Sequence, residues 1–473
     1  MKLPSAGHSG FSVRVALAAF LAAVSLAGAG EHAPVDLHRP ALADLGSGDT
    51  LTGDWGGART ALGDHGVAFT ANYTGEVLGN VRGGIRKGAI YDALLIFGAD
   101  IDAEKLIGWC GANFHVTACY PHGASLSSKD TGDLGLVSNI DAYDSLRLYE
   151  AWFEQNLFGN RLSLRAGFLA ADAEFGVMDL ATPFIHSNFG PPSVVSNDFP
   201  SATYPYSALG VRLRIQPAPG WSVLFGIYDG NPAPGVFPDP SPGAAPSNEF
   251  NHWGTHFALR HDEGAMLFAE MGWRLNAPPK CDQSDNAGDD AKAGKSEESG
   301  PRPLAGSYKV GCVYHTDEFS DIGDVTLGRA NRRGVRGDSA LYLSAEQEVW
   351  REPGTKADGL AAFARVAFAP GDRNLFQHSV EAGLVYAGLW QSDARDHLAL
   401  GASWAEISGD VASAQRRAGL PEQDYEAVVE LTYQYQLTKW CVLQPDVQWV
   451  IHPGGSSVLQ DALVLGWRVT LTF

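Results

Sequence analysis

The chain has few cysteines and, beyond its first thirty residues, no long apolar run. Its five cysteines are an odd number, which excludes a complete disulfide framework. Cys110 and Cys119 flank eight strand-like residues, and a strand at about 3.3 Å per residue holds them about 30 Å apart, too far for a bridge. Cys281 and Cys312 flank a polar segment and remain free to pair. No stretch after residue 30 approaches 18 apolar residues, so we expect no membrane-spanning helix.

The chain also lacks a basic surplus and catalytic signatures. It has 34 Lys and Arg against 54 Asp and Glu, a net charge of −20, whereas nucleic-acid binding requires a basic surface. Neither G-x-S-x-G nor H-E-x-x-H occurs, and no carboxylate pair stands at a defined separation. His115 and Cys119 share one strand face but lie about 13 Å apart, too far for one metal ion. We therefore predict no catalytic residue, metal, cofactor or nucleic-acid partner.

The first residues are typical of an export signal. Lys2 and Arg14 supply positive charge, residues 15–30 form an apolar run, and residues 27–29 read A-G-A before the predicted cleavage point. We expect residues 1–29 to be removed as a signal peptide and residues 30–50 to form an N-terminal extension. Loss of two basic residues would give a mature net charge of −20 − 2 = −22.

The rest of the chain alternates repeatedly between apolar and polar residues. In "VVELTYQYQLT" (428–438), Leu431 and Tyr433 share one face while Glu430 and Thr432 share the other. Segments 161–168, 211–215, 251–260, 266–275 and 441–451 repeat this period. Alternation is the pattern of half-buried strands. Ionisable residues in the middle of the polar faces favour a water-filled barrel lumen over a soluble sandwich.

The last strand strengthens this interpretation. "LVLGWRVTLTF" (463–473) alternates to its end at Phe473, like the terminal strand of bacterial outer-membrane proteins, whose final aromatic residue is read by the barrel-insertion machinery. We count about seventeen candidate strands, but a single-chain barrel has an even number. We predict an all-β transmembrane antiparallel barrel of sixteen strands over residues 67–473, in outer-membrane lipid. The region 308–350 is the weakest, because strand directions counted from the two ends conflict there.

The connections divide by length. Those at 156–161, 217–221, 261–265 and 437–440 are short and predicted to be periplasmic, whereas long loops are expected at 121–145, 170–206, 229–250 and 276–307. The segment 276–307 is polar, and we expect a mobile extracellular loop. The segment 175–206 is rich in aromatics and predicts a loop that folds inward as a constriction.

The opening motif "LTGDWGGART" (51–60) predicts a short helix directly before the first strand. Thr52 or Asp54 can cap a helix over 58–65, and Gly66 can end it in the left-handed conformation. We expect residues 51–66 to form a periplasmic helix motif at the barrel mouth, with Trp55 at the lipid interface or packed under the barrel. An ordinary N-terminal cap is the alternative.

The same motif resembles the N-terminal signature of the OprB family of carbohydrate-selective porins. The likeness continues through "LYEAWFEQNLFGNRLSLRAGF", "YPYSALGVRLRIQPAPGWSVLFGIYDGNP" and "YEAVVELTYQYQLTKWCVLQPDVQWVIHPGG", in collinear order over most of 51–473. The resemblance implies a sixteen-stranded barrel, often a homotrimer, that passes monosaccharides by diffusion. The Pro-rich 229–250, the insertion 276–307 and the cysteines depart from the pattern, which affects loop conformation and substrate size but not the fold.

Strand parity suggests which residues meet a sugar. Keeping Tyr149 and Phe153 on the lipid side turns Glu150, Trp152 and Glu154 into the lumen, and the reverse would place two carboxylates in hydrocarbon. Trp152 offers a flat face to a sugar ring, and the carboxylates offer acceptors to its hydroxyls. A lumen whose charges only satisfy one another is the alternative.

A hairpin at residues 158–160 should bring Arg165 beside the two glutamates. The same parity predicts other lumen-facing residues, of which only some can reach the constriction. The predicted sugar-contacting set is Glu150, Trp152, Glu154, Arg165, Arg212, Arg214, Glu270, Arg274, Glu430, Asp446, Gln448 and Arg468, and Arg365 and Glu381 also face inward.

Two alternatives to a monosaccharide porin remain open on sequence grounds. One is a general or sugar-acid-selective porin, which would differ only in lumen charge. The other is an exported soluble β-protein that binds or cleaves glycans, which would need neither an apolar belt nor a terminal Phe.

Overall fold

A computed structural model describes residues 50–232, 253–257, 259, 263–276, 303–329, 334–355, 357–391, 394–455 and 457–473. The predicted signal peptide, almost all of the N-terminal extension, Cys281 and most of the segments 229–250 and 276–307 lie outside these residues. Cys110, Cys119, Cys312 and Cys441 are free thiols. No helix within the described ranges is long and apolar enough to cross a membrane.

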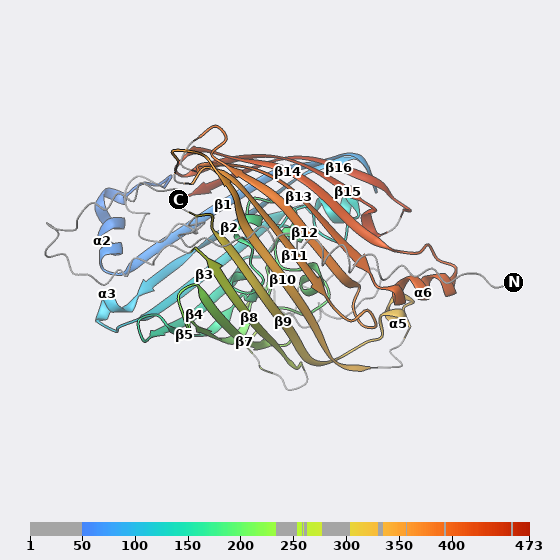
Figure 1. Cartoon of the computed structure of the whole chain (residues 1–473), viewed down its shortest axis with the longest axis horizontal. Coiled ribbons are helices and arrows are strands. Elements are labelled where there is room, and N and C mark those ends of the chain that lie inside the picture. Colours follow the sequence, from blue (N-terminus) through green and yellow to red (C-terminus); the bar gives the residue numbers. More distant parts are fainter. Residues whose placement is uncertain are drawn as a thin grey trace.

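Sixteen antiparallel strands close into a barrel, as predicted (Figure 1). Each strand pairs with its neighbours in sequence, and β1 pairs with β16 to close the sheet, with Glu76 opposite Arg468. The strands are β1 (Val67–Gly84), β2 (Gly88–Asp102), β3 (Ala112–Gly123), β4 (Arg147–Leu157), β5 (Leu162–Leu169), β6 (Ala208–Ile215), β7 (Trp221–Asp229), β8 (Ala265–Leu275), β9 (Gly306–Phe319), β10 (Val335–Arg351), β11 (Gly359–Phe368), β12 (Phe376–Ala387), β13 (Asp396–Ile407), β14 (Tyr425–Thr438), β15 (Cys441–Ile451) and β16 (Gln460–Thr472).

Short helices occupy the two ends of the barrel and its interior. At the end that carries the C-terminal residue lie η2 (Trp55–Gly57), α2 (Ala58–Asp64) and α3 (Ala103–Ile107); at the other end α5 (Ile322–Thr326) packs against α6 (Gly409–Ala418) (Figure 1). The remaining turns are η3 (Ser127–Thr131), η4 (Ala171–Ala173), η5 (Asp179–Ala181), η6 (Ser187–Phe189), α4 (Ser193–Ser196) and η7 (Pro453–Gly455).

The two barrel ends differ in the length of their connections. Residues 158–161, 216–220 and 439–440 make short turns at the end that carries the start of β1 and the end of β16. Outer-membrane barrels have short periplasmic turns and longer extracellular loops, so this end is the periplasmic one.

Two expectations about the connections are wrong. Residues 253–257 form no strand despite their alternation, and β7 pairs directly with β8, so 261–265 belongs to an extracellular connection rather than a periplasmic turn. Leu275, the last residue of β8, pairs with Gly306, the first residue of β9, at the periplasmic end of the barrel. The two strands are therefore connected on the periplasmic side, not on the extracellular side as predicted. The uncertain region 308–350 holds two strands, β9 and β10, joined on the extracellular side.

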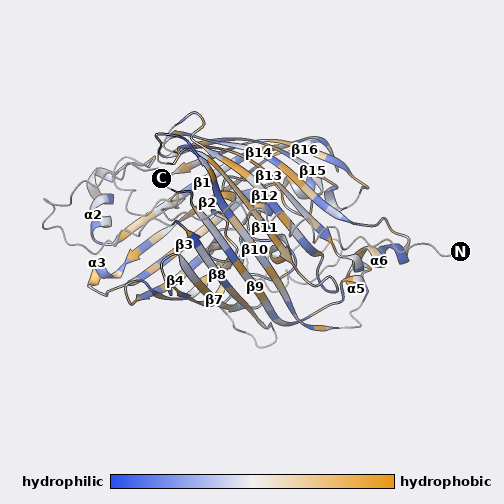
Figure 2. Cartoon of the chain, viewed as in Figure 1, coloured by the Kyte–Doolittle hydropathy of each residue, from blue (hydrophilic) through white to orange (hydrophobic). Residues whose placement is uncertain are grey.

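Alternation along each strand separates the lumen from the membrane. Val447 is 40% exposed and Trp449 49%, while Gln448 between them is fully buried. Figure 2 shows the resulting mixture of hydrophobic and hydrophilic residues along every strand. Because side chains alternate across a pleated sheet, one sequence builds an apolar outer belt and a polar inner wall at once.

One residue breaks the predicted parity. Tyr149 was expected to face lipid, but it packs inside the barrel against the cluster of Leu94, Cys119 and Ile140. The register between β3 and β4 shifts between Thr117 and Ala118, so β4 carries one extra residue there. Such a bulge lets two successive side chains point to the same face.

Aromatic side chains gather at the periplasmic ends of neighbouring strands. The indole of Trp273 stacks on Trp221 at 5.8 Å between ring centroids and lies 5.6 Å from the ring of Tyr308. Trp350 contacts Tyr386 at 6.3 Å. Rings with an apolar body and a polar edge favour the membrane interface, so this band marks the periplasmic rim of the belt.

The opening motif forms the predicted helix, α2, which ends one residue earlier than expected. Gly57 occupies its N-cap position with φ 95°, and no side chain caps the helix there. Asp54 lies three residues earlier; its Oδ1 accepts from the main-chain N–H of Thr60 at 2.9 Å, and Gly66 has φ 86° after the helix. Thr52 accepts instead from the indole N–H of Trp55, which is 46% exposed. The sequence therefore predicted the helix and its stop, but neither Thr52 nor Asp54 is its N-cap residue.

Candidate functional site

Two extracellular connections fold into the barrel and fill part of it. We call residues 124–146 the first inner loop and residues 170–207 the second inner loop. In the second, Phe184 stacks on Phe189 at 4.1 Å and meets Phe363 of β11 edge-on at 5.6 Å. Phe175 and Phe199 are also buried in the interior. The aromatic-rich segment thus folds inward, as its composition predicts.

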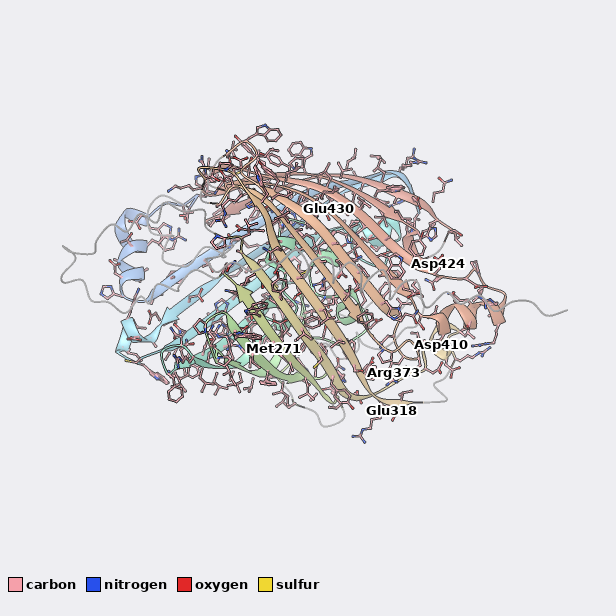
Figure 3. All side chains as sticks on the ribbon, viewed as in Figure 1. Met271, Glu318, Arg373, Asp410, Asp424 and Glu430 are labelled. Atoms are coloured by element: carbon pink, nitrogen blue, oxygen red, sulfur yellow. The ribbon has the colours of Figure 1, made fainter. Side chains whose placement is uncertain are left out.

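Carboxylates of the barrel wall hold the second inner loop by its backbone. The N–H of Gly176 donates to Glu270 at 2.8 Å, and that of Leu180 donates to Glu346 at 2.6 Å. The N–H groups of Ile185 and His186 both donate to Glu430, labelled in Figure 3, at 2.6 and 3.0 Å. Each of these bonds satisfies a loop N–H group inside the barrel, so these wall residues fix the path of the loop.

Arg365 of β11 binds the same loop by its carbonyls. Its guanidinium donates to the main-chain oxygens of Gly176 at 3.0 Å, Asn188 at 3.2 Å and Gly190 at 2.7 Å. Its Nε donates to Glu381 at 3.0 Å, and both side chains are fully buried. A buried ion pair of this kind is costly to break, because the remaining partner keeps an uncompensated charge.

The first inner loop is held in the same manner and locks onto the second. Glu426 accepts from the N–H groups of Leu134 and Gly135, at 2.8 and 2.7 Å. Between the loops, the N–H of Asn139 donates to the oxygen of Ile185 at 2.7 Å. The carboxylates of this side of the wall are therefore occupied by loop backbone.

Two ionisable groups of the second inner loop are displaced from their ordinary titration range by burial. Burial lowers the pKa of His186 to about 3, so its imidazole is neutral at pH 7. Burial raises the pKa of Asp198 well above its usual value, although this carboxyl accepts from the N–H groups of Leu375 and Phe376.

A charged cluster on β4, β5 and β6 remains partly accessible. Glu154, Arg165 and Arg212 are direct cross-strand neighbours. Glu154 binds Arg212 at 2.8 Å and Arg165 at 3.2 Å, and Glu174 of the second inner loop reaches Arg212 at 2.6 Å and Arg165 at 3.6 Å. Arg214 lies beyond them, 3.8 Å from Glu154. We call these five residues the arginine cluster.

Trp152 supports the arginine cluster from the side. Its ring stacks on His115 of β3 at 4.7 Å, and the guanidinium carbon of Arg165 lies 3.7 Å from its ring centroid. The face that was predicted to receive a sugar ring thus contacts protein side chains. Glu150, next along the inner face, is 9% exposed and accepts from the N–H of Ala170.

The predicted sugar-contacting residues fall into two groups. Arg165, Arg214, Arg274 and Trp152 lie on the inner wall with part of the side chain accessible, and the exposed fraction is 15% for Arg165 and 28% for Arg214. The others are covered by the inner loops or by neighbouring side chains. This covered group comprises Glu150, Glu154, Arg212, Glu270, Glu430, Asp446, Gln448 and Arg468, together with Arg365 and Glu381.

Sequence reasoning missed several residues of this interior. Glu174 lies on a loop, where no periodicity indicates its direction, yet it completes the arginine cluster. Lys309 on β9 and Glu346 on β10 occupy inward positions in the alternation of their strands. Their inward direction follows from this alternation once the region 308–350 is divided into two strands. Lys309 donates to the oxygen of Val177, at 2.5 Å, and so also holds the second inner loop.

Among the residues that the structure describes, one group has the composition of a metal site. Ligand atoms of Asp229, His256 and Glu263 lie within 4.8 Å of one another, at the extracellular end of β7 and in the following connection. No ligand is assigned to them.

Known proteins resemble this chain over nearly its whole length. The family model "Carbohydrate-selective porin, OprB family" matches residues 86–473. Porin B of Pseudomonas aeruginosa is 26% identical over 454 residues, covering 89% of this chain and 91% of that protein, and the putative porin QuiX of Acinetobacter baylyi is 23% identical with 89% and 93% coverage. The high-pH structure of Pseudomonas putida OprB superposes with a TM-score of 0.75 at 25% identity, covering 90% of this chain and 99% of that one.

These matches agree with the closed sixteen-stranded barrel, and they remove the exported soluble glycan-binding or glycan-cleaving protein as an alternative. The chain belongs to the OprB family of carbohydrate-selective porins, and it is an outer-membrane β-barrel porin rather than an enzyme.

Proposed function

We propose that monosaccharides and similar small polar carbohydrates diffuse past the arginine cluster. The observation that supports this path is the cluster itself: the side chains of Arg165, Glu174 and Arg214 stay 15 to 28% accessible while the opposite wall is covered by loop. Carboxylates accept from sugar hydroxyls and guanidiniums donate to them, without the tight binding that would stop a solute leaving.

Some of the predicted residues are proposed to contact the solute, and others to hold the contacting residues or the inner loops in place. Arg165, Arg214 and Arg274 are proposed to contact the solute, because part of each side chain is accessible. Trp152 is proposed to hold Arg165 in place through the cation–π contact instead of stacking on the sugar. The residues that bind loop backbone or one another in the covered interior are proposed as positioning residues, namely Glu150, Glu154, Arg212, Glu270, Glu430, Asp446, Gln448 and Arg468.

Liposome swelling with the full mature protein tests this path. The panel is glucose, a neutral non-sugar of equal size, a sugar acid and an amino acid. We expect Arg165→Gln to lower the ratio of glucose to non-sugar permeation about fivefold, since one hydrogen bond to a charged donor is worth about 1 kcal/mol or more. Arg416→Gln is the matched control, because Arg416 is 67% exposed in an ion pair with Glu422 at the extracellular end.

An unchanged ratio in Arg165→Gln would place the sugar filter elsewhere. Equal permeation of sugar, non-sugar and amino acid by the parent protein would favour the general porin instead.

Two proposed partners rest on likeness and position. Phe473 is proposed to be read by the barrel-insertion machinery; in the barrel its N–H pairs with the oxygen of Ala71 at 2.9 Å. Deleting Phe473 should reduce the amount inserted in the outer membrane while export continues, and insertion at the parent's level would contradict this. A homotrimer is the assembly implied for some members of the family, and the mass of the detergent-solubilised protein would test it.

A further inference from the structure

We infer that the channel also admits monoanionic sugar acids, and that Arg214 is the residue that selects them. This inference rests on the proposed path along the arginine cluster. It concerns charge, whereas the proposed function concerns hydroxyl groups, so the two can fail separately.

Three guanidiniums share two carboxylates in the arginine cluster. Arg212 is fully buried and takes the closest contacts with both, 2.8 Å to Glu154 and 2.6 Å to Glu174. Arg165 has the next contacts, at 3.2 and 3.6 Å. One positive charge is left over when the two carboxylates are ionised.

The surplus charge lies with Arg214. Its ion-pair contact is 3.8 Å to Oε1 of Glu154, an oxygen that already accepts from Arg212 and from the hydroxyl of Ser163. Its Nε is buried and has no hydrogen-bond partner among the described residues. Its side chain as a whole is 28% accessible, the highest value in the arginine cluster. A partly accessible guanidinium whose ion-pair contact is this long is suited to a carboxylate, which it can bind through two parallel hydrogen bonds.

The inner wall continues in positive charge toward the periplasm. Arg214 is in register with Leu224 of β7, which is in register with Glu270 of β8, and Arg274 lies four residues further toward the periplasmic end of β8. Arg274 is exposed, whereas Glu270 is buried and bonded to the second inner loop and to Tyr342. An anion leaving Arg214 thus meets a second accessible guanidinium rather than a free carboxylate.

The acidic character of the whole chain does not oppose this inference. The formal net charge is −20, but the inward carboxylates Glu346, Glu426 and Glu430 are buried and bound to loop N–H groups. Charges on a covered wall act less on a solute than charges beside its path, because accessible groups touch it directly.

The test uses planar bilayers and liposomes containing the full mature protein, with glucose and gluconate as probes. We expect the parent to pass gluconate. In a potassium gluconate gradient, gluconate permeation would move the zero-current potential away from the value expected for potassium permeation alone. Arg214→Gln should lower the gluconate-to-glucose permeability ratio about tenfold, and Arg214→Lys should recover part of it, since it keeps the charge without the paired donors. Arg416→Gln should leave the ratio unchanged.

A parent channel that excludes gluconate while passing glucose would overturn the inference and leave the proposed function standing. A ratio unaffected by Arg214→Gln would overturn it as well. Passage of gluconate without any preference for glucose over the neutral non-sugar would instead contradict the proposed function and retain the inference. If Arg214→Gln fails to assemble, the zero-current potential of the parent still shows whether gluconate passes, and Arg214→Lys tests the role of Arg214.

Discussion

Replacing Arg365 by methionine should release the second inner loop and enlarge the channel. The change removes donors to three loop carbonyls, at Gly176, Asn188 and Gly190, and leaves Glu381 buried without its cation. Removing one partner of a buried ion pair typically costs about 3–5 kcal/mol. We expect single-channel conductance to rise severalfold and disaccharides to permeate at rates near those of monosaccharides.

Two further variants separate loop release from general damage. Arg365→Met with Glu381→Gln removes both buried charges, and we expect it to regain stability while the channel stays enlarged, because the loop carbonyls still lack their donor. Arg373→Met is the matched control; Arg373, labelled in Figure 3, pairs with Asp372, a residue whose side chain is 46% exposed at the extracellular end. Parent-like conductance in a folded Arg365→Met protein would show that other contacts suffice to hold the loop.

Replacing Arg59 by alanine should weaken the closure of the barrel. Arg59 lies in α2 and is 8% exposed. Its guanidinium donates to the main-chain oxygens of Phe473 at 2.7 Å and Phe69 at 3.2 Å, and to the hydroxyl of Thr50 at 2.6 Å. It thereby joins the opening motif to β1 and to the end of β16, the two strands whose pairing closes the sheet.

We expect Arg59→Ala to lower the free energy of unfolding by about 3 kcal/mol, since buried hydrogen bonds to a charged donor contribute about 1.5–3 kcal/mol each. The measurement is the urea midpoint of detergent-solubilised protein, read from heat-modifiable migration on a gel. Sugar permeation by the folded fraction should not change. An unaltered midpoint would show that β1–β16 pairing alone secures the seam.

Trp55→Ala gives a graded comparison within the same motif. The guanidinium of Arg59 lies 4.8 Å from the Trp55 ring centroid, and an exposed cation–π contact contributes about 0.5–1 kcal/mol. The loss of stability should therefore be smaller than that of Arg59→Ala, again without an effect on flux. Arg416→Ala, which removes an exposed ion pair at the far end, should leave the urea midpoint unchanged.

The sequence by itself determined which kind of barrel forms and which way most residues face. The burial of Glu430 and Gln448, and the exposure of Trp449 and Leu465, follow from alternation alone, because the pleat of a strand sends successive side chains to opposite faces. The helix before the first strand could be predicted for a similar local reason, since a short helix and its glycine stop are set by neighbouring residues.

Alternation along one strand gave wrong predictions where the pairing with a neighbouring strand determines the structure. The alternating residues 251–260 were predicted to form a strand, but residues 253–257, the main part of this segment that the structure describes, form none, and β8 pairs directly with β7. Tyr149 turns inward because the register with β3 slips at Ala118, which no pattern within β4 reveals. Registers and bulges belong to pairs of strands, so a single strand does not specify them.

Only the tertiary structure decided what the inward charges do. Glu430 and Arg365 were correctly placed inside, but they bind loop residues more than 170 positions away in the chain instead of standing free in the lumen. Arg59 meets Phe473 across 414 positions. Strand periodicity determines the direction of a side chain. The residue that this side chain binds depends on how the barrel closes and on which loops fold into it. Both depend on contacts between residues that are far apart in the sequence.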